Sequence, residues 1–177
     1  MEERNCINVC SINGLKNNIE YIDALLNNNF SMDSIVPIVN NSSNIDRLLR
    51  WGCEEDMELL TYISSCFSEP QSIDMSYTTD IPNTLFLRTI SKTYNLTIEH
   101  AYNNYEAGYV GYNKIVNGEI IETDFEENNK SPKYIALQQK YNFYSDEQMK
   151  EMTIDNETLP KEQTIISMKD LLKLQDK

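Results

Sequence analysis

The sequence predicts an α+β fold in which helices cover one face of a largely antiparallel sheet. Two observations carry this prediction. Strand-like and helix-like patterns alternate along residues 5–125, and Asn117 and Gly118 join two strand-like runs in the manner of a tight hairpin. Elements in this order form layered α+β domains. A chain of 177 residues, 40% of them hydrophobic, can bury one such core.

The first half of the chain begins with a strand and a helix. Residues 5–12 form a short strand-like run that ends in a turn at Gly14. A helix is predicted over residues 15–29, where one face is apolar: Leu15, Ile19, Ile22, Leu25 and Leu26. Pro37 and the Asn/Ser cluster after it predict an irregular link, which leads into residues 45–60 with Trp51 and Gly52 at their centre.

The second half predicts another strand and helix, then a strand and a hairpin. Residues 71–82 read as an extended strand and residues 83–94 as a helix. Residues 96–102 alternate as strands do, and residues 108–125 form the hairpin. A further short helix is predicted after Pro132.

The pattern changes near residue 127, so we predict a core domain over residues 1–127 and a C-terminal extension over residues 128–177. The extension is polar and richer in lysine, with one apolar run from Ile165 to Leu174. Two arrangements fit this composition. The extension packs on the domain as a helix, or it serves as a mobile tail or partner-binding helix.

The net charge of −13 is concentrated in the middle of the chain. Residues 51–127 hold fourteen acidic side chains against three basic ones. Because proteins that bind DNA or RNA use Lys and Arg to displace counterions, this distribution disfavours direct nucleic-acid binding. Two interpretations remain: the acids serve solubility, or they form a patch that engages a basic partner.

The second interpretation defines a candidate partner-binding surface made of acids and tyrosines. Tyrosines can anchor a contact while the acids attract a basic partner. The candidates are Glu54, Glu55, Asp56, Glu58, Glu99, Tyr102, Tyr105, Glu106, Tyr109, Glu119, Glu122 and Asp124. The structural alternative is that the tyrosines pack on the sheet, beside a bulge or close backbone approach at Gly108 and Gly111.

No catalytic or metal-binding pattern accompanies these residues, so we expect no enzyme, no metal and no cofactor. Cys6 and Cys10 are four apart, which on a strand places both on one core-facing side. The other two cysteines, Cys53 and Cys66, are thirteen apart and lack zinc-ligand spacing. His100, the sole histidine, fits a packed side chain better than a general base.

The N-terminal residues lack the basic start and apolar run of a signal peptide. No stretch approaches the roughly 18 apolar residues of a membrane span. We therefore expect a soluble protein in the cytoplasm of a host cell, with no membrane contact.

Several separated motifs resemble the YubB-like or Api92-like family of phage and plasmid proteins, over about residues 5–125. They occur in the family's order. The motifs are Asn5, Asn8 and Asn13-Gly14, the segment from Ser34 to Pro37, Trp51-Gly52, residues 90–96, and Tyr102, Glu106, Gly108 and Gly111. The resemblance implies a ferredoxin-like fold, no established activity, and a setting of conflict between a mobile element and its host.

One departure from the family is chemically important. Where relatives commonly continue with a small residue, lysine and a second tryptophan after Trp51-Gly52, this chain has Cys53, Glu54, Glu55 and Asp56. A basic position has become acidic, so the contact made by that lysine cannot be transferred.

The combined prediction is an acidic protein-binding module of a phage, virus or plasmid. In its most concrete form, the protein is an inhibitor or decoy that occupies the nucleic-acid-binding surface of a host defence complex. The alternative is a structural or assembly protein of a virus particle, whose C-terminal extension docks on neighbours. The sequence leaves a homo-oligomer open under either interpretation.

Overall fold

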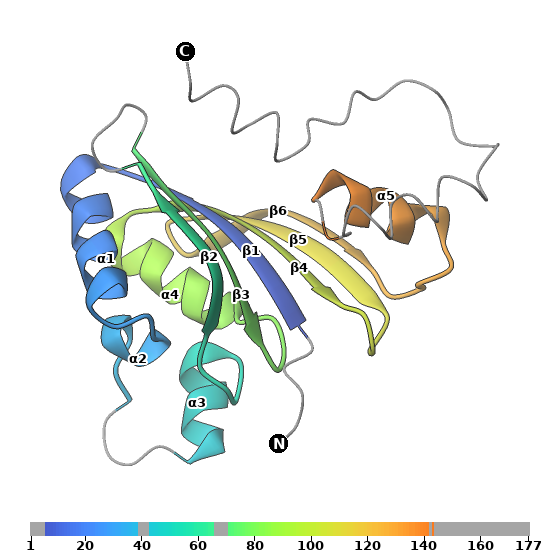
Figure 1. Cartoon of the computed structure of the whole chain (residues 1–177), viewed down its shortest axis with the longest axis horizontal. Coiled ribbons are helices and arrows are strands. Elements are labelled where there is room, and N and C mark those ends of the chain that lie inside the picture. Colours follow the sequence, from blue (N-terminus) through green and yellow to red (C-terminus); the bar gives the residue numbers. More distant parts are fainter. Residues whose placement is uncertain (1–5, 39–42, 66–70, 142, 144–177) are drawn as a thin grey trace.

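A six-stranded antiparallel sheet forms the centre of the protein, with helices on both sides (Figure 1). The computed structural model describes residues 6–38, 43–65, 71–141 and 143. The strands are β1 (Cys6–Asn13), β2 (Glu58–Ser64), β3 (Ser72–Thr79), β4 (Thr97–Asn104), β5 (Tyr109–Val116) and β6 (Glu119–Glu126). The helices are α1 (Lys16–Asn28), α2 (Met32–Ile35), α3 (Asn44–Trp51), α4 (Thr84–Tyr94) and α5 (Pro132–Lys140).

The strand order is β2-β3-β1-β4-β5-β6, with β1 paired to both β3 and β4. Within it, β1-α1-β2-β3-α4-β4 is a ferredoxin-like βαββαβ unit, and β5 and β6 extend the sheet beyond β4. The predicted α+β, ferredoxin-like fold is therefore confirmed. Asn117 and Gly118 form the β5–β6 turn with φ angles of 51° and 80°, which explains why these two residues signal the hairpin.

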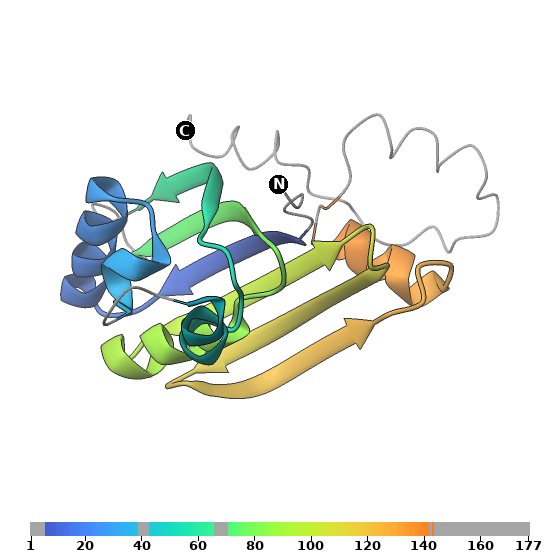
Figure 2. The ribbon, with the colours of Figure 1, turned by 90° about the horizontal axis from the view of Figure 1, so that it is seen from below.

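The two faces of the sheet carry different cores. Helices α1 to α4 cover what we call the helical face, and α5 lies on the opposite, outer face (Figures 1 and 2). Alternate residues of β1 divide between the faces. Cys6, Asn8, Cys10 and Ile12 are buried on the helical side, while Ile7 and Val9 pack against the core beneath α5. Cys6 and Cys10 thus share one face, as their spacing predicts.

One strand and one helix boundary differ from the sequence-based expectation. Strand β2 was not predicted, because as an edge strand it is mostly exposed and shows no alternation of buried and exposed residues. The predicted irregular link contains the short helix α2 and leads into α3 at Asn44. Helix α3 begins with a capping box between Ser43 and Asp46 and is capped at its C-terminal end by Gly52, whose φ of 80° suits glycine.

Helix α5 is the described part of the predicted extension, and it packs on the domain. Tyr134 and Leu137 are buried against Ala101, Val110 and Tyr112 on the outer face. Residues 142 and 144–177 of the extension, including the apolar run from Ile165 to Leu174, lie outside the described residues. No described helix is both long and apolar enough to cross a membrane.

Candidate functional site

A β-bulge in β6 gathers the acidic residues of that strand on one face. Strand β6 has one residue more than β5 opposite it, because Glu122 pairs with Lys114 while Ile120 pairs with Ile115. The extra residue is Ile121. Glu119 and Glu122 are three apart and would point to opposite faces of a regular strand, but the bulge returns them to the same face.

The outer face of β6 therefore carries four carboxylates, which we call the acidic strip. Its members are Glu119, Glu122, Asp124 and Glu126, opposite Val116, Lys114, Tyr112 and Val110 of β5. Three of these acids, Glu119, Glu122 and Asp124, are binding candidates predicted from the sequence, whereas Glu126 was not predicted. Glu126 lies one residue beyond the predicted hairpin, which ended at residue 125, whereas β6 continues to Glu126. The bulge, which is visible only once β6 is paired with β5, is what adds Glu119 to the same face.

Lys114 lies beside the acidic strip and is drawn toward another predicted site residue, Glu99. Its ammonium is 3.0 Å from Glu99 Oε1 on β4. The hydrogen bond that Lys114 donates to Glu99 raises the pKa of Lys114, and the negative charge of Glu122 adds to the effect. Within the described parts of the chain, Glu119 and Glu122 form no ion pair of their own.

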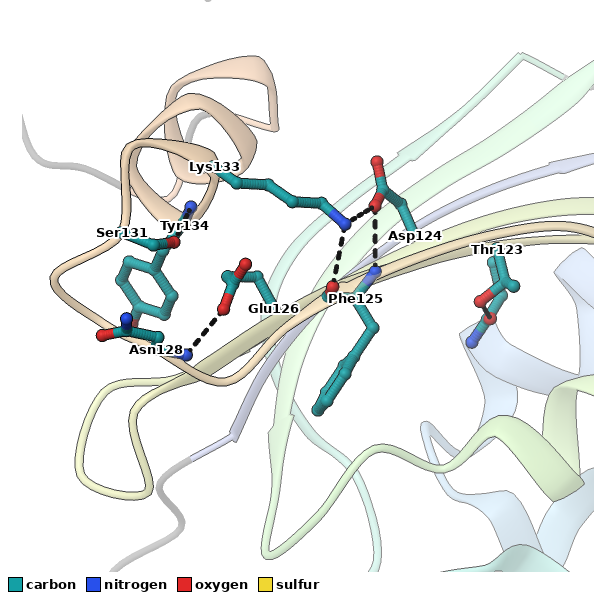
Figure 3. Close-up of polar contacts among 9 residues, drawn as sticks. Thr123, Asp124, Phe125, Glu126, Asn128, Ser131, Lys133 and Tyr134 are labelled. Atoms are coloured by element: carbon teal, nitrogen blue, oxygen red, sulfur yellow. Dashed lines mark hydrogen bonds and ion pairs between the residues drawn. The ribbon is translucent and has the colours of Figure 1, made fainter.

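Asp124 has a different environment, because Lys133 of α5 reaches it (Figure 3). Lys133 Nζ lies 2.6 Å from Asp124 Oδ1 and donates to the carbonyl oxygen of Phe125 at 3.0 Å. The amide of Phe125 donates to Asp124 Oδ1 at 3.1 Å. The hydrogen bond from Lys133 lowers the pKa of Asp124. Both backbone polar groups of Phe125 are thus engaged by side chains, which makes this part of β6 a poor template for another strand.

The segment that links β6 to α5 is held by short-range hydrogen bonds. Glu126 Oε1 accepts from the amide of Asn128 at 2.9 Å, and Ser131 Oγ accepts from the amide of Tyr134 at 3.0 Å (Figure 3). Pro132 occupies the first turn of α5, where its missing amide costs nothing. These caps fix where α5 begins and thereby position Lys133 against the acidic strip.

Tyr102 and Tyr109 do not lie with the acids on the outer face. Tyr102 is buried on the helical face, with its ring over Gly111, where a Cβ would lie 2.3 Å from Tyr102 Cζ. Tyr109 stands between Tyr102 and Phe125, with ring centroids 6.3 and 6.1 Å apart. Tyr105, in the turn after β4, donates its hydroxyl to the carbonyl oxygen of Phe143. Tyr102 therefore packs within the fold, and Tyr105 contacts a residue of the cluster beneath α5.

The other predicted acids lie between α3 and β2, away from the acidic strip. Glu54, Glu55, Asn44, Arg47 and Asp80 line a polar cleft of about 300 Å³. The carboxylate of Asp80 accepts from the amides of Glu54 and Glu55 at 3.1 Å, and Glu54 Oε2 accepts from Asn44 Nδ2 at 2.9 Å. The cleft is mixed in charge, because Arg47 lies within it.

Asp56 is used within the fold. Its Oδ1 accepts from the amides of Met32 and Met57, each at 2.7 Å, and its Oδ2 accepts from the hydroxyl of Ser31. These bonds join the segment before β2 to the start of α2. Two further predicted residues are exposed near this end of the sheet, Glu58 at the start of β2 and Glu106 in the β4–β5 turn.

Burial determines the protonation of the thiols and the histidine in the described interior. Burial raises the pKa values of Cys6 and Cys10 to about 12 and lowers that of His100 to about 3. His100 Nε2 lies 2.9 Å from Asn8 Oδ1, and Asn8 Nδ2 donates to Thr79 Oγ1 at 2.8 Å. Because the amide of Asn8 already donates to Thr79, its oxygen accepts from His100, and the neutral ring is a packed histidine. The described residues contain no group of three His, Cys, Asp or Glu placed to hold a metal ion.

These features define a small ferredoxin-like protein with helices α1 to α4 on one face of its sheet, α5 on the other, and a strip of carboxylates beside one edge. Residues 63–155 match the family model described as the ferredoxin-like domain in Api92-like protein, and the chain belongs to this family. The match begins within β2, so the motifs before residue 63 that resemble the family lie outside it.

Among solved structures, the chain is similar to the crystal structure of a protein api92 from Yersinia pseudotuberculosis. The two sequences are 17% identical, and the TM-score is 0.38. The similarity covers 54% of this chain and 34% of that chain, so the matched region is about a third of the length of its solved relative. No curated protein matches the chain.

Proposed function

We propose that this protein is an acidic protein-binding module that engages a basic surface of another protein through the acidic strip and Glu99. The observation that carries the proposal is the bulge at Ile121, which places all four acids of β6 on one face. Side chains two residues apart on a strand are about 7 Å apart, so the strip presents closely spaced negative charges on a paired strand.

The partner that fits this chemistry is a protein surface rich in Lys and Arg. Such surfaces commonly bind the phosphates of nucleic acids, and a fixed row of carboxylates can compete for the same side chains. In the most concrete form of the proposal, the protein is an inhibitor or decoy encoded by a phage, virus or plasmid. It occupies the nucleic-acid-binding surface of a host defence complex without binding nucleic acid itself.

The proposed contact is made by side chains and not by addition of a strand to β6. Lys133 and Asp124 engage the backbone of Phe125, which supports this mode of binding. Contacts between exposed charges weaken when salt screens them. Among the strip residues, Glu119 and Glu122 are the best choices for mutation, because both are exposed, while Asp124 and Glu126 also hold the α5 segment.

Affinity purification from the natural host lysate, at low and high salt, tests the proposal. The expected result is retention of a nucleic-acid-handling complex that elutes as salt rises, and weaker retention by Glu122→Gln. The control is Glu20→Gln, which removes one charge from an exposed i,i+4 pair on α1. Retention of coat or scaffold proteins that is the same at low and high salt would contradict the proposal and favour an assembly role. An empty column would also contradict it and would reopen the case for a small-molecule enzyme.

A further inference from the structure

The two edges of the sheet differ in chemistry. Strand β6, at one edge, is acidic, and its backbone is engaged at Phe125 by Asp124 and Lys133. Strand β2, at the other edge, has no charged side chain from Leu59 to Ser64 and exposes Leu59, Leu60 and Ile63. The protein therefore has one acidic, partly closed edge and one neutral, apolar edge.

Soluble proteins usually protect an exposed edge strand with charged residues, proline or a bulge. From Leu59 to Ser64, β2 has only the bulge of these three, since Leu60 is an extra residue between the pairs Leu59–Tyr77 and Thr61–Ser76. The four residues from Thr61 to Ser64 pair regularly with β3. An apolar edge of this kind is suited to pairing with another strand.

We propose that β2 pairs antiparallel with β2 of a second copy of this chain, which joins the two sheets into one. The charge distribution selects this occupant. Copies that each carry a net charge of −13 repel one another, so they associate most readily where the surface is neutral. A basic partner would gain little from a strand without carboxylates, whereas Leu60 and Ile63 of one copy can pack against the same residues of the other.

The direction of pairing follows from Glu58, the one charged residue of β2. Parallel pairing in register would place the two Glu58 side chains on adjacent strands, about 4.8 Å apart. Antiparallel pairing about a two-fold axis places them at opposite ends of the joint. The axis is then perpendicular to the sheet, so the acidic strips of both copies face the same side and can contact one partner together.

The joint is small, so the dimer is weak and reversible. Strand β2 has seven residues, and a contact of that length falls below the roughly 1,200 Å² of total buried surface found in stable complexes. The proposal is independent of the proposed function, and salt separates the two. Screening reduces the repulsion between two acidic copies and strengthens the dimer, whereas it weakens a contact between acidic and basic surfaces.

Sedimentation velocity of the full chain over about 5–500 µM, a range suited to weak association, tests the proposal with a matched pair of variants. Leu60 and Ile121 are each the extra residue of a bulge in an edge strand, with exposed fractions of 53% and 61%. Leu60→Lys and Ile121→Lys change the net charge equally. We expect the wild type to show a monomer–dimer equilibrium that shifts toward the dimer as salt rises. Leu60→Lys should raise the dissociation constant of the dimer at least about tenfold, because it places like charges in the joint. Ile121→Lys should leave the dissociation constant unchanged.

A wild-type protein that stays monomeric at every concentration and salt level would overturn the proposal, as would equal loss of dimer in both variants. Circular dichroism and thermal unfolding show whether Leu60→Lys folds, and Ile63→Lys provides a second substitution if it does not. Backbone NMR spectra give an independent measurement. As the protein concentration rises, the chemical shifts that change should belong mainly to residues 58–64. Changes confined to residues 119–126 would place the contact on β6 and would contradict the proposal.

Discussion

Lys133 of α5 contacts Asp124 and Phe125 of β6 at once, with its Nζ 2.6 Å from Asp124 Oδ1 and 3.0 Å from the carbonyl oxygen of Phe125 (Figure 3). This contact joins the helix on the outer face to the edge of the sheet. It also neutralises one of the four acids in the acidic strip, so the charge available to a partner lies mainly on the other three.

Replacing Lys133 with methionine should loosen the edge of the sheet at Phe125. The substitution keeps the length of the side chain but removes the donor to the Phe125 carbonyl and the counter-charge of Asp124. Hydrogen exchange of the Phe125 amide should become several-fold faster, because its acceptor Asp124 is less firmly held. The control is Lys130→Met, in the segment before α5, which should leave that amide unchanged. Equal exchange rates in both variants would show that Lys133 does not hold this edge.

Acid should destabilise the fold through His100, which is fully buried. Burial lowers the folded-state pKa of His100 to about 3, below its ordinary value of 6.5. The unfolded chain therefore binds a proton that the folded protein does not, so stability falls as pH drops below about 6.5, by about 1.4 kcal/mol per pH unit. The loss attributable to His100 ends near the folded-state pKa.

Urea unfolding of the wild type and His100→Gln at several pH values between 7 and 4.5 measures this effect. Carboxylates contribute their own pH dependence in both proteins, so the informative quantity is the difference between the two curves. We expect the variant to lose less stability than the wild type over this range. Parallel curves would mean that His100 takes up its proton at the same pH in the folded and the unfolded protein, and would contradict the lowered pKa.

Gly111→Ala should destabilise the protein by about 1–3 kcal/mol, the usual effect of overpacking a filled site. The new methyl group would lie 2.3 Å from Cζ of the Tyr102 ring, which has little room to move because Tyr102 is buried. In a Tyr102→Ala background the same change should cost much less. Chemical unfolding of the four proteins measures this coupling, and an equal cost in both backgrounds would show that the ring does not cover Gly111.

Asp56→Ala should cost about 1–3 kcal/mol, because three donors lose the carboxylate that they share. Thermal or chemical unfolding tests this, with the exposed Glu127→Ala as the control. A stability loss confined to Asp56→Ala would support the structural role of this acid. If Asp56→Ala leaves stability unchanged but abolishes partner binding, Asp56 is a binding residue and not a structural one.

The sequence predicted much of the fold because its strongest signals are local. Asn117-Gly118 identifies the hairpin through its backbone preference, and the apolar spacing of residues 15–26 identifies α1. Strand β2 was not predicted, since an exposed edge strand lacks the alternation that a buried face imposes. The acids of β6 could be selected by charge, but Glu119 shares the face of the other three only because of the bulge at Ile121, which appears only in the register with β5. The contact of Lys133 with Asp124 likewise requires the packed position of α5.

The most direct test of the central claim is the salt dependence of partner binding by the wild type and by Glu119→Gln/Glu122→Gln. The dissociation constant of the purified complex would be measured from about 50 to 300 mM salt, where screening changes strongly. We predict that the wild-type complex weakens steeply as salt rises, and that the variant binds more weakly at low salt with a shallower salt dependence. Identical affinity and identical salt dependence in the two proteins would contradict the assignment of the acidic strip as the binding surface.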